Sequence, residues 1–397
     1  MTLEAGASRV PDLSLLGQRV DNAIDRALAE QRVVGATMVV SHQGRILYRR
    51  CAGLADREAG RPLQPDSIFL LSSLTKPIVS AAALALVEQG RLTLDDRVGS
   101  WLPDFHPTLA DGSPTEITVR HLLTHTAGLT YGLFQPADGP YRQAGVSDGL
   151  AEPGLAMDEQ LRRLAGVPLS YAPGTAWGYS VALDVLGAIL ERAADASLPD
   201  IVRRLVTTPL GMVNTAFSVP DPDRLVTPYI GSAPPRRMAD LEEVVAADGT
   251  AIRFAPGRIF VPDSFSAGGV GMAGTASDFL TFLEAVRTGG GPVLTPGSAQ
   301  AMMTNQIGSL RINVEPTPSW GFGFGGAVLI DPRLAADPRP AGTWKWGGVY
   351  GHHWYVDRRN ELSVVVLTNA ALDGMTGRLP EDLLDAVYGP GPIAPGR

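Results

Sequence analysis

The stretch that decides the fold reads Ser73-Leu74-Thr75-Lys76-Pro77-Ile78-Val79. The positions that follow, as far as Val87, are apolar nearly all round, so we expect a buried helix that ends near Gly90. Proline is tolerated in the first turn of a helix, and Pro77 falls there. Because residues three apart lie on one helical face, Ser73 and Lys76 come within side-chain reach of each other.

The basic residues of the chain contain only two lysines, Lys76 and Lys345, and all the others are arginines. Lysine can lose its proton at an accessible pH, which arginine cannot. Burial lowers the pKa of a lysine, and a partly neutral Lys76 amine beside Ser73 would be a base that activates the hydroxyl. A capping serine followed by a solvated lysine is the competing interpretation, and the tetrapeptide alone does not decide between them.

A second informative segment, residues 171–180, is an aromatic-rich loop that contains Pro173-Gly174 and leads into a helix from Val181. We expect its Tyr179 to hydrogen-bond to Ser73, and the neighbouring Lys76 to lower the pKa of Tyr179 toward the phenolate. A tyrosine that only packs in a loop is the alternative.

A third segment, residues 345–351, is a glycine-rich predicted strand with the sequence Lys345-Trp346-Gly347-Gly348-Val349-Tyr350-Gly351. Glycines let a backbone approach a substrate closely, and a strand N–H beside a helix N-terminus forms an oxyanion hole. The candidate donors are the backbone amides of Ser73 and Val349.

Both ends of the chain predict pieces of one antiparallel sheet. Alternating β-rich runs form two expected hairpins, and helices are expected at residues 15–28 and 380–388, with strands at 36–41, 45–52, 354–357 and 362–368. The sequence between these two end regions predicts helices and many loops. We therefore expect an α/β (α+β) protein in which residues 1–80 and 255–397 form the sheet domain. Residues 81–254 form a mostly helical inserted domain, with the active site in the cleft between the two.

The three segments together resemble the three motifs of class C β-lactamases and penicillin-binding proteins. The run from His121 to Leu129 is similar to a further signature of that superfamily. Among its branches the chain most resembles the family VIII carboxylesterases, because Trp346-Gly347-Gly348 is followed by Val349-Tyr350-Gly351-His352. The similarity covers nearly the whole chain.

The resemblance implies a serine hydrolase that forms an acyl-enzyme on Ser73 and needs no cofactor or metal. Lys76 and Tyr179 would share the general acid and base roles, and the amides of Ser73 and Val349 would hold the oxyanion. The substrate pocket would be lined by Val181, Trp346, Gly347, Gly348 and Tyr350.

Two departures from the β-lactamase pattern bear on the substrate. Val181 stands where the tyrosine motif usually ends in asparagine, and Trp346 stands where the strand motif usually begins with lysine. A register one residue earlier would give that role to Lys345, and the two registers exclude each other because strand side chains alternate faces. With Trp346 in place we expect small uncharged carboxylic esters rather than β-lactams or D-alanyl peptides. Acyl transfer from the same acyl-enzyme, and a binding or sensor module on the same fold, are the other candidate functions.

Gly145-Val146-Ser147-Asp148-Gly149 matches the nucleophile elbow of a different hydrolase fold. That elbow requires a strand before the serine and a helix after it. Ser147 is instead flanked by turn-forming residues, so we do not expect it to be the nucleophile.

The histidines and the single cysteine receive structural interpretations. His121 and His125 have the spacing of a zinc pair on a helix, but the glutamate of a catalytic zinc motif is absent between them. Cys51 lies in a predicted strand and is expected to be a packed core thiol. His352 and His353 follow the glycine-rich segment and have no assigned role.

The net charge of -8 and the scattered basic residues argue against a nucleic-acid partner. The first 30 residues carry acidic groups and no apolar core, so they predict no secretory signal. The longest apolar run, residues 78–87, is shorter than the roughly 20 residues that cross a bilayer. We therefore expect a cytoplasmic protein with a small-molecule ester as its partner and no membrane association; its oligomeric state is left open.

Overall fold

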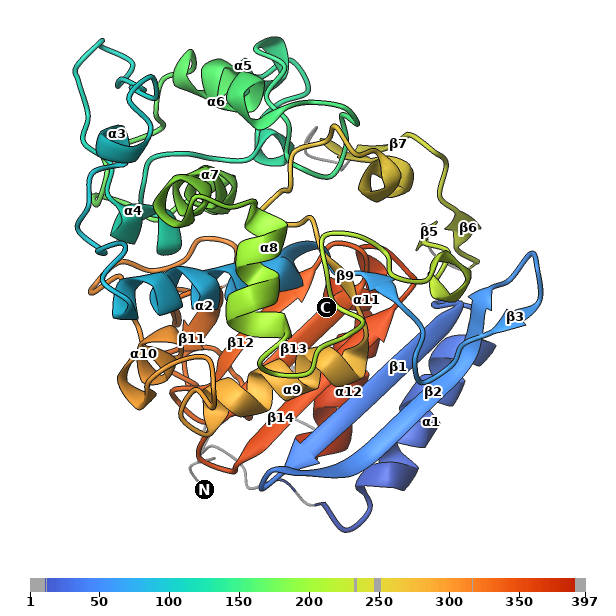
Figure 1. Ribbon diagram of the computed structural model, residues 1–397. Coiled ribbons are helices and arrows are strands. Elements are labelled where there is room, and N and C mark those ends of the chain that lie inside the picture. Colours follow the sequence, from blue (N-terminus) through green and yellow to red (C-terminus); the bar gives the residue numbers. More distant parts are fainter. Residues whose placement is uncertain (1–10, 12, 232–233, 246–250, 316, 390–397) are drawn as a thin grey trace.

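The computed structural model describes residues 11, 13–231, 234–245, 251–315 and 317–389 (Figure 1). Its largest element is an eight-stranded sheet in the order β10-β11-β12-β13-β14-β1-β2-β3. The strands are β1 (Gly35–His42), β2 (Arg45–Asp56), β3 (Arg61–Pro62), β10 (Trp320–Phe322), β11 (Ala327–Leu329), β12 (Trp344–Gly348), β13 (His352–Asp357) and β14 (Leu362–Thr368). Strand β1 pairs antiparallel with β14, so the two ends of the chain share one sheet, which confirms the predicted fold class.

Alternate side chains of the sheet enter cores on opposite faces. Met38 and Val40 of β1 pack with α1 (Leu16–Ala29) and α12 (Arg378–Tyr388). Val39, between them, belongs to the core that contains α2 (Thr75–Glu88) and α9 (Ala276–Arg287). In Figure 1, α9 lies on one face of the sheet and α1 and α12 on the other. Each fully buried Val, Leu or Ile side chain contributes roughly 1.5–3 kcal/mol to such a core.

The chain between the two halves of the sheet is largely helical. Its helices are α3 (Val98–Trp101), α4 (Val119–Leu123), α5 (Pro140–Gln143), α6 (Met157–Ala165), α7 (Ala182–Ala194) and α8 (Leu198–Val202). This part also holds two short antiparallel ribbons, β5 (Tyr229–Ile230) with β6 (Arg236–Arg237) and β7 (Glu242–Val245) with β8 (Ala251–Phe254). Helix α2 passes without a break through position 80, where the sequence placed a domain boundary. The domain boundaries themselves stay a prediction.

Helix α2 begins two residues later than the sequence suggested. Residues Ser72–Leu74 form one 3₁₀ turn, which follows the short strand β4 (Phe69–Leu70), and the α-helix starts at Thr75. Its side chains from Thr75 to Leu86 are all buried, as an apolar pattern all round the helix predicts. Because α2 and α7 pack against each other, the start of α2 lies between the helical part and the sheet.

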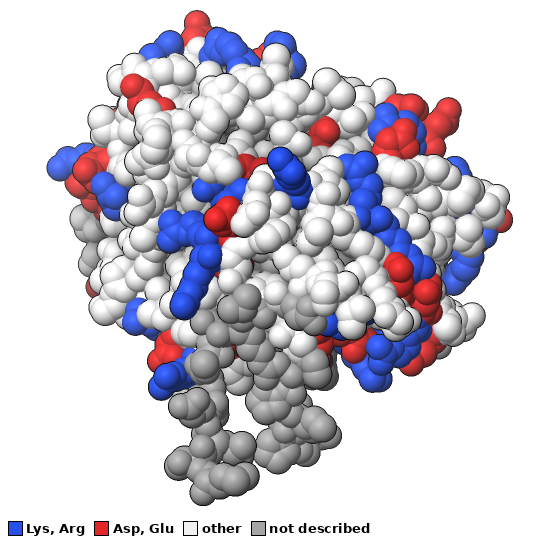
Figure 2. All heavy atoms as spheres, turned by 90° about the horizontal axis from the view of Figure 1, so that it is seen from below, with Lys and Arg blue, Asp and Glu red and all other residues white. Residues whose placement is uncertain are grey.

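The remaining elements complete the surroundings of α2. They are β9 (Ala273–Gly274), which pairs with β4, and the helices α10 (Pro296–Met302) and α11 (Asp373–Thr376). Among the described residues, none of the helices has the length and apolar character needed to cross a membrane. On the face shown in Figure 2, basic and acidic side chains are interspersed rather than separated by sign.

Cys51 is not the packed core thiol that the sequence predicted. It lies on β2 and is partly exposed, with a hydrogen bond of 3.4 Å from Thr37 Oγ1 to its sulfur. Tyr48 and Arg50 on the same strand bond to Asp21 of α1. Since side chains alternate along a strand, Cys51 points to the face of β2 that α1 does not cover.

Candidate active site

The candidate nucleophile Ser73 lies in the 3₁₀ turn before α2, and its exposed fraction is 5%. The preceding Ser72 is fully buried and has a φ of 44°, a conformation that costs energy for a residue other than glycine. Strand β12 packs closely against this turn, since a Cβ atom at Gly348 would lie only 2.5 Å from Ser72 Oγ. The glycine therefore brings β12 against the serine turn, whereas the sequence analysis expected it to make room for a substrate.

Lys76 lies one turn into α2 and is completely buried. Its Nζ is 3.2 Å from Ser73 Oγ and 2.9 Å from the carbonyl oxygen of Gly269. It also lies above the ring of Tyr179, 4.5 Å from the ring centre. Burial lowers the pKa of Lys76 to about 7, although the nearby charge of Asp184 opposes the shift. A neutral amine beside Ser73 is therefore accessible near physiological pH.

Tyr179 meets Ser73 from the loop before α7. Its hydroxyl donates to Ser73 Oγ at 2.8 Å and accepts from Trp346 Nε1 at 3.0 Å. The ring packs against those of Trp346 and His125, each with centres 4.9 Å away. The expected lowering of its pKa is wrong: burial raises the pKa of Tyr179, and the hydrogen bonds with Ser73 and Trp346 only partly oppose this. Tyr179 is therefore a neutral phenol that donates a hydrogen bond to Ser73.

Strand β12 places Trp346 and Lys345 on opposite faces. Trp346 bonds to Tyr179, whereas Lys345 Nζ forms a 2.8 Å ion pair with Glu315 and lies 4.3 Å from the ring centre of Trp320. The predicted register with Trp346 toward the serine is the one observed.

Val349 lies in a turn rather than in a strand. Strand β12 ends at Gly348, and the Gly351 amide donates to the Gly348 carbonyl at 2.9 Å, which closes the turn into β13. The glycine-rich run alone predicts a continuous strand, but glycine also suits turns with positive φ, and Gly351 has a φ of 105°.

Two expected pocket residues are buried. Val181 is fully buried at the residue before α7, where it joins the core shared with α2, and Tyr350 packs against Phe254. Val181 therefore offers its side chain to the protein interior and not to an open pocket.

The histidines and Ser147 hold the structure around the site. His121 and Thr118 cap the start of α4 with reciprocal hydrogen bonds, and His125 Nδ1 lies 3.0 Å from Ser180 Oγ. Ser147 is buried and donates to Glu152 at 2.8 Å, with neither a strand before it nor a helix after it. Across the described ranges, His, Cys, Asp and Glu side chains nowhere gather in threes or more to hold a metal ion.

His352 and His353 also bond to the main chain of neighbouring segments. His352 Nε2 lies 2.9 Å from the Leu70 carbonyl of β4, and His353 Nδ1 lies 3.1 Å from the Gly374 carbonyl of α11. Burial lowers the pKa of each to about 4, so both are neutral at physiological pH.

The sequence analysis missed Asp184, an acidic residue in the first turn of α7 that is only 1% exposed. Its Oδ1 accepts from the Gly269 amide at 2.8 Å, and the carbonyl of the same glycine receives Lys76. The available signal was one acidic residue within the apolar run Val181-Ala182-Leu183-Asp184-Val185-Leu186. A charge at a position that packs in the core is a candidate functional group.

The fold and the site define the class of the serine β-lactamases and penicillin-binding proteins. Its features are a serine at a helix start with a lysine one turn on, a tyrosine from the helical part and a glycine-rich strand edge. The chain belongs to the Beta-lactamase family, whose model matches residues 20–387.

Known relatives support a narrower assignment within the family. The chain is 50% identical over 381 residues to Esterase EstB of Burkholderia gladioli, covering 95% of this chain and 96% of that protein. It matches the solved structure of EstCE1, a hydrolase with promiscuous acyltransferase activity, with a TM-score of 0.91 and 44% identity, over 95% of this chain and 99% of that one. A more distant relative, 26% identical over 86% of this chain and 88% of that protein, is monacolin J acid methylbutanoyltransferase of Aspergillus terreus. The resemblance to esterases of this superfamily is confirmed.

Proposed function

We propose that this protein is a carboxylesterase that hydrolyses small uncharged esters through an acyl-enzyme on Ser73. The observation that carries the proposal is that one hydroxyl, Ser73 Oγ, contacts both a lysine whose pKa burial lowers and a neutral tyrosine. The similarity to EstB supports the ester as the substrate class.

The three side chains account for the proton transfers of both half-reactions. Neutral Lys76 takes the proton of Ser73 while Oγ attacks the ester carbon, and Tyr179 protonates the departing alkoxide. The proton held by Lys76 then restores Tyr179, so the net proton moves from Ser73 to the alcohol. Water attacks the acyl-enzyme by the reverse sequence, and Ser73 regains its proton.

The proposed oxyanion hole consists of the backbone amides of Ser73 and Val349. The turn that carries Val349 is held in place by a hydrogen bond, because the Val349 carbonyl accepts from the Leu372 amide at 2.9 Å. A donor held in this way stabilises the negative oxygen of the tetrahedral intermediate with little reorganisation.

The side chains near Ser73 favour uncharged substrates. Trp346 presents an apolar ring, and the charge of Lys345 is neutralised by Glu315 on the other face of β12. A carboxylate on a β-lactam or D-alanyl peptide therefore has no cationic partner from β12. A charge-assisted hydrogen bond of that kind is worth about 1.5–3 kcal/mol, so its loss favours neutral esters.

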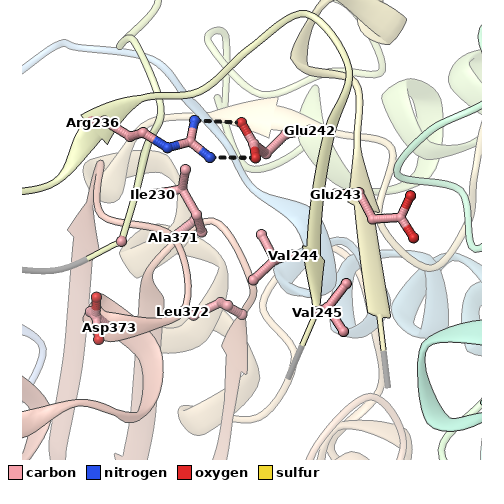
Figure 3. Close-up of a pocket in the computed structure, with 10 residues that line it drawn as sticks. Ile230, Arg236, Glu242, Glu243, Val244, Val245, Ala371, Leu372 and Asp373 are labelled. Carbon is pink, nitrogen blue, oxygen red and sulfur yellow. Dashed lines mark hydrogen bonds and ion pairs between the residues drawn. The ribbon is translucent and has the colours of Figure 1, made fainter. Parts of the chain in front are cut away.

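A cavity of about 330 Å³ lies beside the segment Ala371–Asp373, which follows β14 (Figure 3). Ile230, Val244 and Leu372 supply much of its wall, and the Arg236–Glu242 ion pair lies on one side with hydrogen bonds of 2.7 and 2.6 Å. The wall is mixed, because Glu243 and Asp373 line the cavity together with the apolar side chains.

Leu372 connects this cavity with the oxyanion turn. It has a φ of 65°, which is strained for a branched side chain, and its amide is held by the Val349 carbonyl. A group bound in the cavity therefore lies against a residue that is fixed directly to the proposed oxyanion donor.

Acyl transfer to an alcohol is the second candidate function, since two of the relatives carry that activity in their names. It uses the same acyl-enzyme and differs only in the acceptor. A β-lactamase or D-alanyl peptidase activity has weaker support, because β12 presents Trp346 and no cation to the carboxylate of such substrates. The cytoplasmic location and the lack of a nucleic-acid partner stay proposals, which cell fractionation and binding assays test.

The decisive experiment labels the protein with an alkylphosphonate and identifies the modified peptide by mass spectrometry. The adduct is expected on Ser73 and not on Ser147. Product analysis of p-nitrophenyl butyrate turnover, with and without added alcohol, then separates hydrolysis from acyl transfer. A phosphonate adduct on any other residue would overturn the proposal.

A further inference from the structure

The environment of Lys76 contains a second buried ionisable group, Asp184. The two side chains bind the main chain of the same residue, Gly269, on either side of its Cα: Asp184 Oδ1 accepts from the Gly269 amide at 2.8 Å, and Lys76 Nζ donates to the Gly269 carbonyl at 2.9 Å. The second carboxylate oxygen, Oδ2, is buried and has no hydrogen-bond partner among the described residues. An ionised carboxylate in such a place is costly unless a cation compensates for it.

Gly269 is the residue that permits this arrangement. A Cβ atom there would lie 3.0 Å from Tyr131 Oη, 3.3 Å from Lys76 Nζ and 3.4 Å from Asp184 Oδ1. The segment is also pressed against α7, because a Cβ at Gly268 would lie 2.3 Å from the Leu183 carbonyl. The Gly268-Gly269 segment therefore packs closely against α7 and bonds through the Gly269 carbonyl to Lys76 of α2.

We propose that Asp184 is a positioning residue for Lys76: it orients the Gly269 carbonyl toward the amine, and its negative charge stabilises the ammonium that forms when Ser73 attacks. The proposal rests on the role of Lys76 as the base. In that step the Ser73 O–H bond breaks, the Oγ–carbon bond forms, and the proton appears on Nζ. The positive charge then lies on the opposite side of Gly269 from the carboxylate, and both are bonded to the main chain of that residue.

Other ionisable groups around Asp184 do not replace this partnership. Arg258 donates to the carbonyls of Ala151 and Phe265, and Asp148 accepts from the amides of Gly132 and Leu133. The groups that act on Asp184, or on which it acts, are Lys76, Tyr131, Asp148, Tyr179 and Arg258. Lys76 is the cation that bonds to the main chain of the same residue, Gly269, as Asp184 does.

The scarcity of lysines makes a direct test feasible. Lysine labelled with ¹³C at Cε gives two side-chain signals, from Lys76 and Lys345, and Lys345→Arg assigns them. The pH titration of the Lys76 signal is compared in the wild type and in Asp184→Asn, which keeps an oxygen for the Gly269 amide but loses the charge. Because an opposite charge nearby raises the pKa of a lysine, we expect the midpoint in D184N to fall by roughly 1 pH unit or more.

The same change alters catalysis in a characteristic way. The acid limb of kcat/KM for p-nitrophenyl butyrate should move to lower pH in D184N, while the plateau falls about tenfold, the equivalent of one pKa unit. The matched control is Asp278→Asn on α9, a buried aspartate bonded to Asn214 and Thr215. It should lower the melting temperature without moving the Lys76 midpoint.

An unchanged Lys76 midpoint in folded D184N would overturn the proposal, and the NMR titration does so without any ester substrate. Failure of ester turnover in the wild type would instead count against the proposed function. If D184N does not fold, Asp184→Ser, which is smaller and also uncharged, carries the same expectation and the same refuting result.

Discussion

Replacing Trp346 with phenylalanine tests whether the indole N–H supports Tyr179. In Trp346→Phe the ring that packs against Tyr179 and Phe322 is largely kept, but the 3.0 Å hydrogen bond from Nε1 to Tyr179 Oη is lost. A neutral hydrogen bond contributes about 0.5–1.5 kcal/mol, which corresponds to about a two- to thirteenfold loss of kcat/KM. We expect the upper part of this range, because Tyr179 Oη becomes more negative as it gives up its proton.

The matched control is Trp177→Phe. Trp177 is also buried beside Tyr179, with ring centres 6.3 Å apart, but its Nε1 has no hydrogen-bond partner among the described residues. This variant removes the same N–H group without removing a bond to the site, so its kcat/KM should stay near that of the wild type.

Initial rates with p-nitrophenyl butyrate, together with thermal melting curves for each variant, give the comparison. Equal kcat/KM values for folded Trp346→Phe and Trp177→Phe would refute the reasoning, since the hydrogen bond would then contribute nothing to turnover.

The other predictions use the same esterase assay. Ser73→Ala should abolish turnover, whereas Ser147→Ala should lower the melting temperature and keep most of the activity; the reverse pattern would contradict the assignment. Lys76→Arg should be nearly as inactive as Lys76→Ala, and substantial activity in the arginine variant would limit Lys76 to an electrostatic role. Because Lys76 must be neutral to act as a base, kcat/KM should rise with pH through about 7, and a flat profile from pH 6 to 8 would argue against it. Tyr179→Phe should lose roughly 10²- to 10⁴-fold, the usual effect of removing a general acid, measured as kcat/KM. Trp346→Lys should raise activity on nitrocefin relative to the butyrate ester, and an unchanged ratio would disprove the specificity argument.

The contacts that sequence could predict are those set by local periodicity. Ser73 and Lys76 are three residues apart at a helix start, so helical geometry brings them together whatever surrounds them. The alternation of a strand likewise separates Trp346 from Lys345 once one of the two is placed.

The features that sequence could not predict depend on segments distant in the chain. The bond between Asp184 and Gly269 joins residues 85 positions apart, and no local pattern identifies that pairing. The pKa of Tyr179 depends on burial by Trp346 and His125, which come from segments far from Tyr179 in the chain. A prediction based on the Lys76 charge alone therefore gave the wrong direction for the pKa shift of Tyr179.

The distribution of lysines has a practical consequence for covalent labelling. One ε-amino group is enclosed beside Ser73, and the other is engaged with Glu315 and only partly exposed. Reagents that acylate amines, such as N-hydroxysuccinimide esters, therefore find no freely exposed lysine side chain on this protein. Attachment to a support through lysine side chains is therefore disfavoured, and Cys51, a partly exposed residue on β2 and the single cysteine of the chain, is an alternative.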